Sequence, residues 1–166
     1  MLLGHGSGHH TVPRPTTSNR ALPPITVAPP PQSAAASAPC TKVLATLPVT
    51  LAGLPSRPAL SSSPFVVAWG DPAVVLRCGV ARPAGLVPNS PELTTGVDGV
   101  FYWVDQGKKS TVFTVIDRAV YIEVTVPTTY AGGPLGPIST AVAKALPAVC
   151  VVDATAPAEH LCTHRP

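Results

Sequence analysis

The sequence predicts an α+β fold: one twisted antiparallel sheet of about five strands, covered on one side by two helices and preceded by a disordered Pro-rich N-terminal arm. Three observations support this prediction. Between residues 65 and 126, short apolar or alternating runs are separated by short turns, so neighbouring strands must pair antiparallel. Apolar residues recur at helical spacing on both sides of that region. The first 39 residues hold eight of the 22 prolines and show no hydrophobic period.

The first helix is expected at residues 40–47, with the sequence CTKVLATL. Val43, Leu44 and Leu47 share one helical face there, and Pro48 ends the periodicity. The residues that follow, up to position 64, are rich in Gly, Pro and Ser, which is typical of turns and loops. We therefore expect no regular element between this helix and the first strand.

Five strands are expected after this loop, each bounded by turn residues. They lie at residues 65–69, 73–80, 100–104, 111–116 and 119–126. Gly70-Asp71-Pro72 joins the first two, residues 81–96 form a long proline-containing loop, and Gln106–Lys109 and Asp117-Arg118 make the last two turns. The last strand alternates between Val or Ile and more polar residues, which indicates a sheet with one solvated face.

The second helix is predicted by Leu135, Ile138, Val142 and Leu146, which recur at helical spacing until Pro147 ends the pattern. Both helices need an apolar sheet face to cover, so they are expected on the same side of the sheet. The expected organisation is a disordered Pro/Ala-rich arm or tether at 1–39, an α+β extracytoplasmic domain at 40–150 and a C-terminal tail at 151–166.

Composition excludes several classes of protein. Hydrophobic residues make up 45% of the chain and charged residues only 11%, which excludes a highly charged disordered chain and a coiled coil. The net charge is +3, but no basic run is longer than Lys108-Lys109. A protein that binds phosphates without sequence preference needs clustered cations, so nucleic acid is not expected as a partner.

The start of the sequence has neither the cationic residues nor the apolar stretch of a secretory signal, although Ala36-Ser37-Ala38 resembles a signal-peptidase site. We therefore expect that the natural start lies upstream, or that export has been lost. The window from Ala21 to Thr41 carries no charge, but its prolines are incompatible with a membrane-spanning helix.

Four cysteines bear on the compartment. Cys40, Cys78, Cys150 and Cys162 allow three complete pairings, and none has a neighbour at zinc-ligand spacing. One or two disulfides in an exported domain are expected, with buried free thiols as the alternative. The pairing we favour is Cys40 with Cys150, because these two residues bracket the predicted domain.

The predicted domain lacks the residues of common catalytic sites. All five histidines lie in the arm or in the last seven residues, so a Ser-His-Asp or Cys-His relay cannot form within 40–150. No metal-ligand spacing and no phosphate-binding glycine loop is present, so no metal or cofactor is expected. A pair of carboxylates is the remaining route to hydrolysis. The candidates are Asp71, Glu92, Asp98, Asp105, Asp117 and Glu123.

Residues 68–80, AWGDPAVVLRCGV, resemble a signature of an actinobacterial family that carries a domain of unknown function. VDGV at 97–100 followed by Trp103, and Arg118 ahead of the strand VYIEVTVP, also match that family. The resemblance covers about residues 40–150. It implies a secreted, membrane-anchored or lipoprotein-like protein with a small extracytoplasmic domain. It assigns no catalytic residue.

Two departures from the family matter. The chain lacks the family's N-terminal hydrophobic helix, so membrane proximity depends on an anchor at the true N-terminus. Family members also carry a cysteine shortly before the VDGV-like stretch, where this chain has ELTTG at 92–96. If that cysteine normally pairs with the one at Cys78, the resemblance implies that Cys78 is free here or uses another partner.

The leading hypothesis is a non-enzymatic binding or assembly domain of the cell envelope, with an unknown envelope component as partner. Trp69, Asp71, Arg77 and Arg118 are the candidate interaction residues, expected near one edge of the sheet. Each also has a structural explanation: Trp69 as core, Asp71 as a turn former, and the two arginines as solvated or ion-paired. The alternative function is a small hydrolase that acts on cell-wall glycan or peptide through a carboxylate pair.

Overall fold

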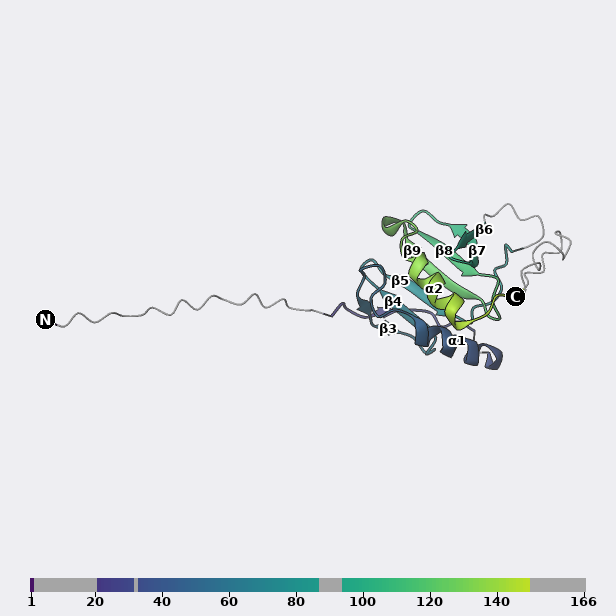
Figure 1. Cartoon of the computed structure of the whole chain (residues 1–166), viewed down its shortest axis with the longest axis horizontal. Helices are drawn as coiled ribbons and strands as arrows, with labels where there is room; N and C mark the ends of the chain where they lie inside the picture. The colour runs from purple at the N-terminus through teal and green to yellow at the C-terminus, as the bar shows by residue number, and fades with distance from the viewer. Residues whose placement is uncertain (2–20, 32, 87–93, 150–166) are drawn as a thin grey trace.

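The computed structural model describes residues 1, 21–31, 33–86 and 94–149 (Figure 1). Its main sheet has seven strands in the order β2-β4-β5-β9-β8-β7-β6, and every neighbouring pair is antiparallel. The strands are β2 Ser56–Arg57, β4 Val66–Trp69, β5 Val74–Cys78, β6 Thr94–Val97, β7 Val100–Gln106, β8 Ser110–Val115 and β9 Ile122–Pro127. The helices are α1 Ala34–Thr46 and α2 Leu135–Ala145, with the short 3₁₀ helix η1 at Thr128–Tyr130. A separate parallel pair joins β1 Ile25–Thr26 to β3 Ala59–Leu60.

The α+β prediction is confirmed, while the strand count is corrected from about five to seven in the main sheet. The two additional strands are β2 and β6, which form the two edges of that sheet. Strand β2 has only two residues, and β6, with the sequence TTGV, falls at the end of the predicted 81–96 loop. Segments this short contain no detectable alternation, so their pairing depends on the neighbouring strand rather than on their own sequence.

Helix α1 begins at Ala34, so the boundary expected between residues 39 and 40 lies inside a helix. Pro39 within the helix and an alanine-rich start conceal the period, but Ala36, Cys40 and Val43 are buried on one side of it. Residues of β1 also pair with the domain, through Ile25 and Thr26. Within the expected arm, the strand residues Ile25 and Thr26 and the first turns of α1 therefore pack on the fold rather than lie apart from it.

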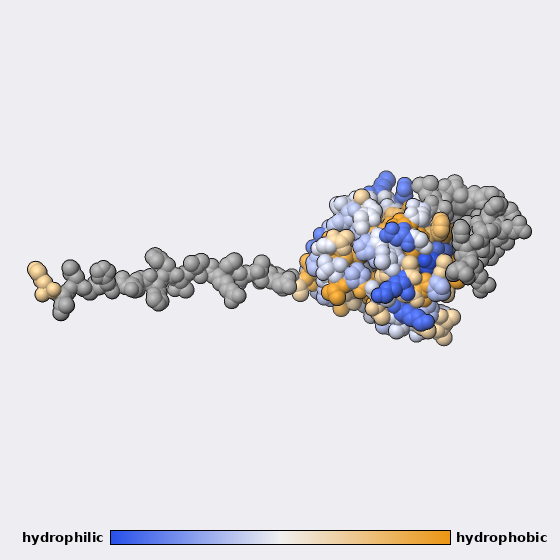
Figure 2. All heavy atoms as spheres, viewed as in Figure 1, coloured by the Kyte–Doolittle hydropathy of each residue, from blue (hydrophilic) through white to orange (hydrophobic). Residues whose placement is uncertain are grey.

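Helix α2 agrees with the prediction, and it lies across the sheet beside α1 (Figure 1). Leu135, Ile138 and Val142 of the predicted apolar stripe are buried. Among the helices of the described ranges, none has both the length and the apolar character to cross a membrane. Charged and apolar residues are interspersed over the side of the molecule on which α2 lies (Figure 2).

The pairing register assigns each sheet residue to one of two faces. We call the side under the helices the helix face and the other side the open face. One cross-strand row of the helix face runs through Val67, Leu76, Val124, Phe113 and Val104. These residues and their helix-face neighbours form one hydrophobic cluster with both helices. The helix face is therefore the core of the domain.

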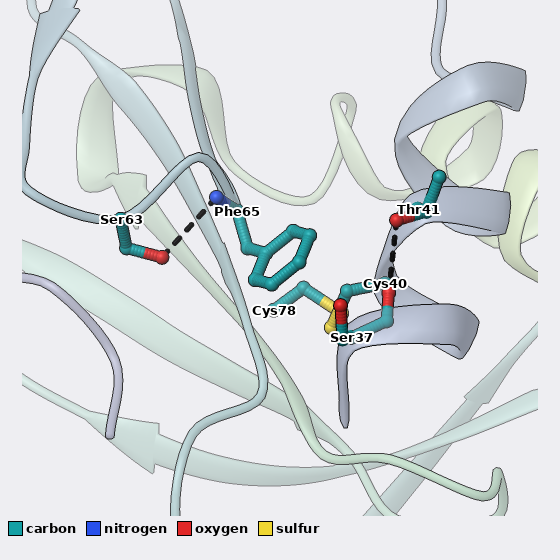
Figure 3. Close-up of a disulfide and its surroundings, with 6 residues drawn as sticks. All are labelled: Ser37, Cys40, Thr41, Ser63, Phe65 and Cys78. Atoms are coloured by element: carbon teal, nitrogen blue, oxygen red, sulfur yellow. Dashed lines mark hydrogen bonds between the residues drawn. A yellow bond between two sulfur atoms is a disulfide. The ribbon is translucent and has the colours of Figure 1, made fainter. Parts of the chain in front are cut away.

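The disulfide joins Cys40 of α1 to Cys78 of β5, and both residues are fully buried (Figure 3). This corrects the favoured pairing of Cys40 with Cys150, which lies outside the described residues together with Cys162. It also supplies the other partner for Cys78 that the resemblance left open. The positions of two cysteines at the ends of a predicted domain do not show which face of the sheet either one occupies. Cys78 lies two residues after Leu76 on β5, so both side chains point toward the helices.

Gly79 follows the disulfide and permits the close approach of α1 to the sheet. Its φ is +88°, and a Cβ placed there would lie 3.1 Å from the Cβ of Ala36 and 3.7 Å from the Sγ of Cys40. The backbone conformation and the contact with α1 both require glycine. The predicted strand at 73–80 accordingly ends at Cys78.

Candidate functional site

The structure does not bring the four predicted interaction residues together on one surface. Trp69 lies in the core on the helix face, where its indole Nε1 donates a hydrogen bond to the carbonyl of Pro48 at 3.1 Å. Asp71 lies in the turn between β4 and β5, and its carboxylate accepts a hydrogen bond from Arg57 at 2.9 Å. These positions match the structural explanations of core residue and turn former. Neither residue lines a described cavity.

Arg118 is buried in the connection between β8 and β9. Its guanidinium forms an ion pair with Asp117 at 2.6 Å and donates to the carbonyl of Gly99 at 2.9 Å. Both partners of the ion pair are at most 6% exposed, and Asp117 Oδ1 and Arg118 Nε have no hydrogen-bond partner among the described residues. This pair links the β8–β9 connection to the β6–β7 turn. A buried pair of this kind is weak support for stability, but loss of one partner is costly.

Arg77 lies on the open face, in a polar row that crosses four central strands. The register places Arg77, Glu123, Thr114 and Trp103 side by side on β5, β9, β8 and β7. Two nitrogens of Arg77 donate to the same oxygen of Glu123, at 3.0 and 2.8 Å. A third nitrogen of Arg77 donates to the carbonyl of Ala28, at 3.4 Å. Arg77 therefore connects the N-terminal segment to the polar row.

A cavity of about 410 Å³ lies at the Trp103 end of this row. Its floor consists of open-face residues of β7, β8 and β9, and its wall is the segment that follows β5. The lining residues are Val80, Ala81, Pro83, Ala84, Gly85, Trp103, Asp105, Val112, Thr114 and Glu123. The wall is held in place by Arg82, which donates hydrogen bonds to the carbonyl of Leu86 and to the hydroxyl of Tyr121. Cavities of this volume are at the small end of ligand-binding sites.

Trp103 is the residue of this cavity that needs an explanation. The side chain is 9% exposed, and its indole Nε1–H has no hydrogen-bond acceptor among the described residues. A buried donor without a partner costs about 1–3 kcal/mol. Trp69, on the other face of the same sheet, satisfies its own indole N–H within the protein. The ring of Trp103 therefore lines the open-face cavity, while its unmet Nε1–H is buried beneath the cavity surface.

Two carboxylates, Asp105 and Glu123, line the same cavity. The Glu123 oxygen Oε1 is occupied by Arg77, whereas Asp105 is exposed and has no ion pair within the described part of the chain. Thr114 lies between them in the strand order, and its side chain is 2% exposed. The site thus combines an exposed carboxylate without an ion pair, a carboxylate paired with Arg77, a hydroxyl and the ring of Trp103.

The sequence matches, over residues 12–151, the family described as "Protein of unknown function (DUF3515)". The chain belongs to the DUF3515 family. This finding supports the resemblance to a family that carries a domain of unknown function, and the match extends into the N-terminal segment that packs on the sheet. No curated protein and no solved structure matches the DUF3515 chain.

Sequence reasoning did not bring together Trp103, Thr114 and Asp105 as a site of this DUF3515 domain, because it named Asp105 only as one of six candidate carboxylates and did not select the other two. The strand VFYWVDQ shows the signal that could have selected two of them, because Phe101, Trp103 and Asp105 alternate with the buried residues of the helix face. An aromatic residue and an acid two positions apart on the solvated side of a strand form one surface. Thr114 requires the register between β7 and β8, which a single sequence does not reveal.

A second cavity, of about 510 Å³, lies on the helix face beyond the start of α2. Its lining combines the apolar side chains of Val104, Phe113 and Val126 with the polar side chains of Thr95, Gln106, Thr111 and Thr128. None of the described residues that line it carries a charge. Its polar side chains are all neutral, whereas the open-face cavity contains two carboxylates.

Proposed function

We propose that this chain is a non-enzymatic ligand-binding domain of a secreted or cell-envelope protein, and that the open-face cavity is its ligand site. The observation that carries this proposal is the open-face cavity of about 410 Å³, in which the exposed carboxylate of Asp105 lies beside Trp103, Thr114 and Glu123. A concave surface with an apolar wall and a few polar side chains is the usual composition of a ligand site.

The disulfide supports an extracytoplasmic location. Cys40 and Cys78 are both fully buried and joined across the α1–β5 contact. Disulfides persist mainly in oxidising compartments, while the cytosol of most cells keeps thiols reduced. The proposed partner is a component of the cell envelope. An anchor at the natural N-terminus would place the domain next to the membrane.

A wall hydrolase is the second candidate, because Asp105 and Glu123 line one cavity. Glycoside hydrolysis needs one carboxyl group that donates a proton and a second that acts as a base or nucleophile. Arg77 holds Oε1 of Glu123 with two hydrogen bonds, which favours a fixed carboxylate in a structural ion pair. Binding without chemistry is therefore the function that this geometry supports better.

The two tryptophans give a direct test, because one lies on each face of the sheet. The oxidised full chain, labelled with 5-fluorotryptophan, would be titrated with soluble fragments of bacterial cell envelope and followed by fluorine NMR. We expect the Trp103 resonance to shift and the Trp69 resonance to stay in place, with Trp69→Phe providing the assignment. Binding that leaves Trp103 unaffected would refute the open-face site.

The same mixtures distinguish the two candidate functions. A binding domain leaves the fragments intact, so the number of reducing ends and free amino groups stays constant over a long incubation. A hydrolase increases one of them, and Asp105→Asn abolishes that increase. Product formation that depends on Asp105 would replace the binding proposal with the hydrolase.

A further inference from the structure

We infer that the cavity on the helix face is a separate binding site for a single-chain amphiphile, whose apolar chain enters the cavity and whose anionic end group stays beside Lys108 and Lys109. We call this cavity of about 510 Å³ the helix-face cavity; it is lined by residues of β6 to β9, η1 and the η1–α2 connection. The inference goes beyond the proposed function, because it concerns other residues on the opposite face of the sheet.

The sheet side of the helix-face cavity offers a preformed apolar surface. Val104, Phe113 and Val126 of three neighbouring strands line it there. Val104 and Val126 are buried, but Phe113 is only half-buried, although it pairs with Val104 in the register. The ring of Phe113 packs edge-on against the ring of Tyr102, with the centroids 6.2 Å apart, which fixes its position. Each methylene group that a ligand buries on such a surface strengthens binding about fourfold.

The polar groups in this lining are neutral. They are the side chains of Thr95, Gln106, Thr111 and Thr128, and the described residues of the lining include no cation and no carboxylate. A charged group that entered the cavity would lose its water without gaining an opposite charge, which is costly. The part of the ligand inside the cavity is therefore uncharged and mainly apolar.

Two lysines lie next to this lining. Lys108 and Lys109 belong to the tip of the β7–β8 hairpin, between Gln106 and Thr111, which pair with each other and both line the cavity. The carbonyl of Lys109 accepts hydrogen bonds from the N–H and the hydroxyl of Thr128, at 3.0 and 3.2 Å. These bonds fasten the hairpin tip to a further lining residue. The lysine positions are therefore fixed relative to the cavity.

The charge beside the cavity selects the end group of the ligand. Both lysines are exposed, and neither forms an ion pair with a described residue. Asp105 alternates with Gln106 on β7 and so lies on the open face, away from this cavity. A carboxylate or phosphate that remains in water near the two ammonium groups is attracted by both, whereas an amine is repelled. An amphiphile with an anionic end group, of which a fatty acid is the simplest example, therefore fits both the lining and the adjacent charge.

The test compares ligands that share one chain and differ in charge. The oxidised full chain would be titrated with octanoate, octyl phosphate, octanol and octylamine by calorimetry, and with butanoate to vary the chain length. We expect the two anions to bind more tightly than octanol, octylamine to bind most weakly, and butanoate to bind more weakly than octanoate. In NMR spectra the amide signals of Ala131 and Gly132 should shift with octanoate, while the fluorine signal of Trp103 stays in place.

Two variants at exposed positions test the residues. Lys108→Ala/Lys109→Ala should weaken octanoate binding about tenfold at low salt, and the difference should shrink at high salt. The matched control is Lys42→Ala/Lys144→Ala, which removes the same charge from exposed positions of α1 and α2 and should bind octanoate like the wild type. Gln106→Glu keeps the shape of the lining but adds a negative charge, so it should weaken octanoate binding and leave octanol binding unchanged.

Four outcomes would overturn the inference. They are no saturable binding of octanoate, equal binding of octanoate and octylamine, an equal loss in the two lysine variants, and sedimentation with phosphatidylglycerol vesicles without any binding of octanoate. The last outcome would assign the lysines to a membrane surface instead of the cavity. None of them affects the open-face site, which is tested by the response of Trp103 to envelope fragments, so the two proposals fail separately.

Discussion

Removal of the Cys40–Cys78 disulfide is expected to destabilise the domain by about 4 kcal/mol. The two cysteines are 38 positions apart, and release of a loop of this length raises the entropy of the unfolded chain by roughly 13 cal/mol/K. This value, multiplied by a temperature near 298 K, gives the estimate. With a urea m-value of about 2 kcal/mol/M, the midpoint of unfolding falls by about 2 M.

Urea denaturation followed by circular dichroism measures this change in three samples: the oxidised wild type, the reduced wild type and the variant Cys40→Ala/Cys78→Ala. The reduced wild type keeps both sulfur atoms in the core, so its difference from the double variant measures lost packing alone. Reductant added to the double variant measures the contribution of any other cysteine. A reduced wild type whose midpoint stays within about 0.5 M of the oxidised protein would refute the reasoning.

Three further predictions concern glycine packing, indole hydrogen bonding and pH. Gly79→Ala should lower the free energy of unfolding by about 1–2 kcal/mol more than Gly53→Ala. Both glycines have a positive φ, but only the Cβ added at position 79 meets a neighbour, the Cβ of Ala36 in α1 at 3.1 Å. Equal urea midpoints for the two variants would contradict this prediction. Trp69→Phe should lower the free energy of unfolding by about 1–3 kcal/mol more than Trp103→Phe, because it breaks a hydrogen bond whereas Trp103→Phe removes a donor without an acceptor. Thermal and urea unfolding of the two variants measure the difference. A larger loss for Trp103→Phe would show that its indole N–H does have an acceptor. Burial raises the pKa of Tyr102 to about 12. Above pH 10 the phenol is therefore deprotonated in the unfolded chain before it is deprotonated in the folded one. Roughly 2–3 kcal/mol of stability should be lost between pH 10 and 12. Tyr102→Phe should lack this part of the loss, and a variant with the full alkaline loss would show that Tyr102 does not cause it.

Much of the fold could be predicted because its central elements have a clear period. Strand β9 alternates strictly between buried and half-buried residues, and α2 has its apolar residues on one side. Turn residues between these elements indicate antiparallel pairing without further information. The predictions failed where the period is absent, in α1 with Pro39 at its centre and in the short edge strands β2 and β6.

The candidate site was harder to predict than the fold, because its residues come together through register. Arg77 was selected from the sequence as an interaction residue, but its partner Glu123 lies 46 positions away and was named only among the candidate carboxylates. Trp103 and Thr114 face each other only in the β7–β8 pairing. A one-residue slip of that pairing would move either residue to the other face, and a single sequence does not fix the register.

The N-terminal limit of the domain follows from two arginines that each hold both a carboxylate and the preceding segment. Arg57 pairs with Asp71 and donates to the carbonyl of Pro23 at 2.8 Å, and Arg77 pairs with Glu123 and donates to the carbonyl of Ala28. Hydrogen bonds from charged donors to backbone carbonyls are stronger than hydrogen bonds between neutral groups. Because one of these arginines also orients a carboxylate of the open-face cavity, the segment at 21–31 supports the site as well as the fold. A functional domain of this chain therefore begins no later than Pro23, well before the helix that the hydrophobic period indicates.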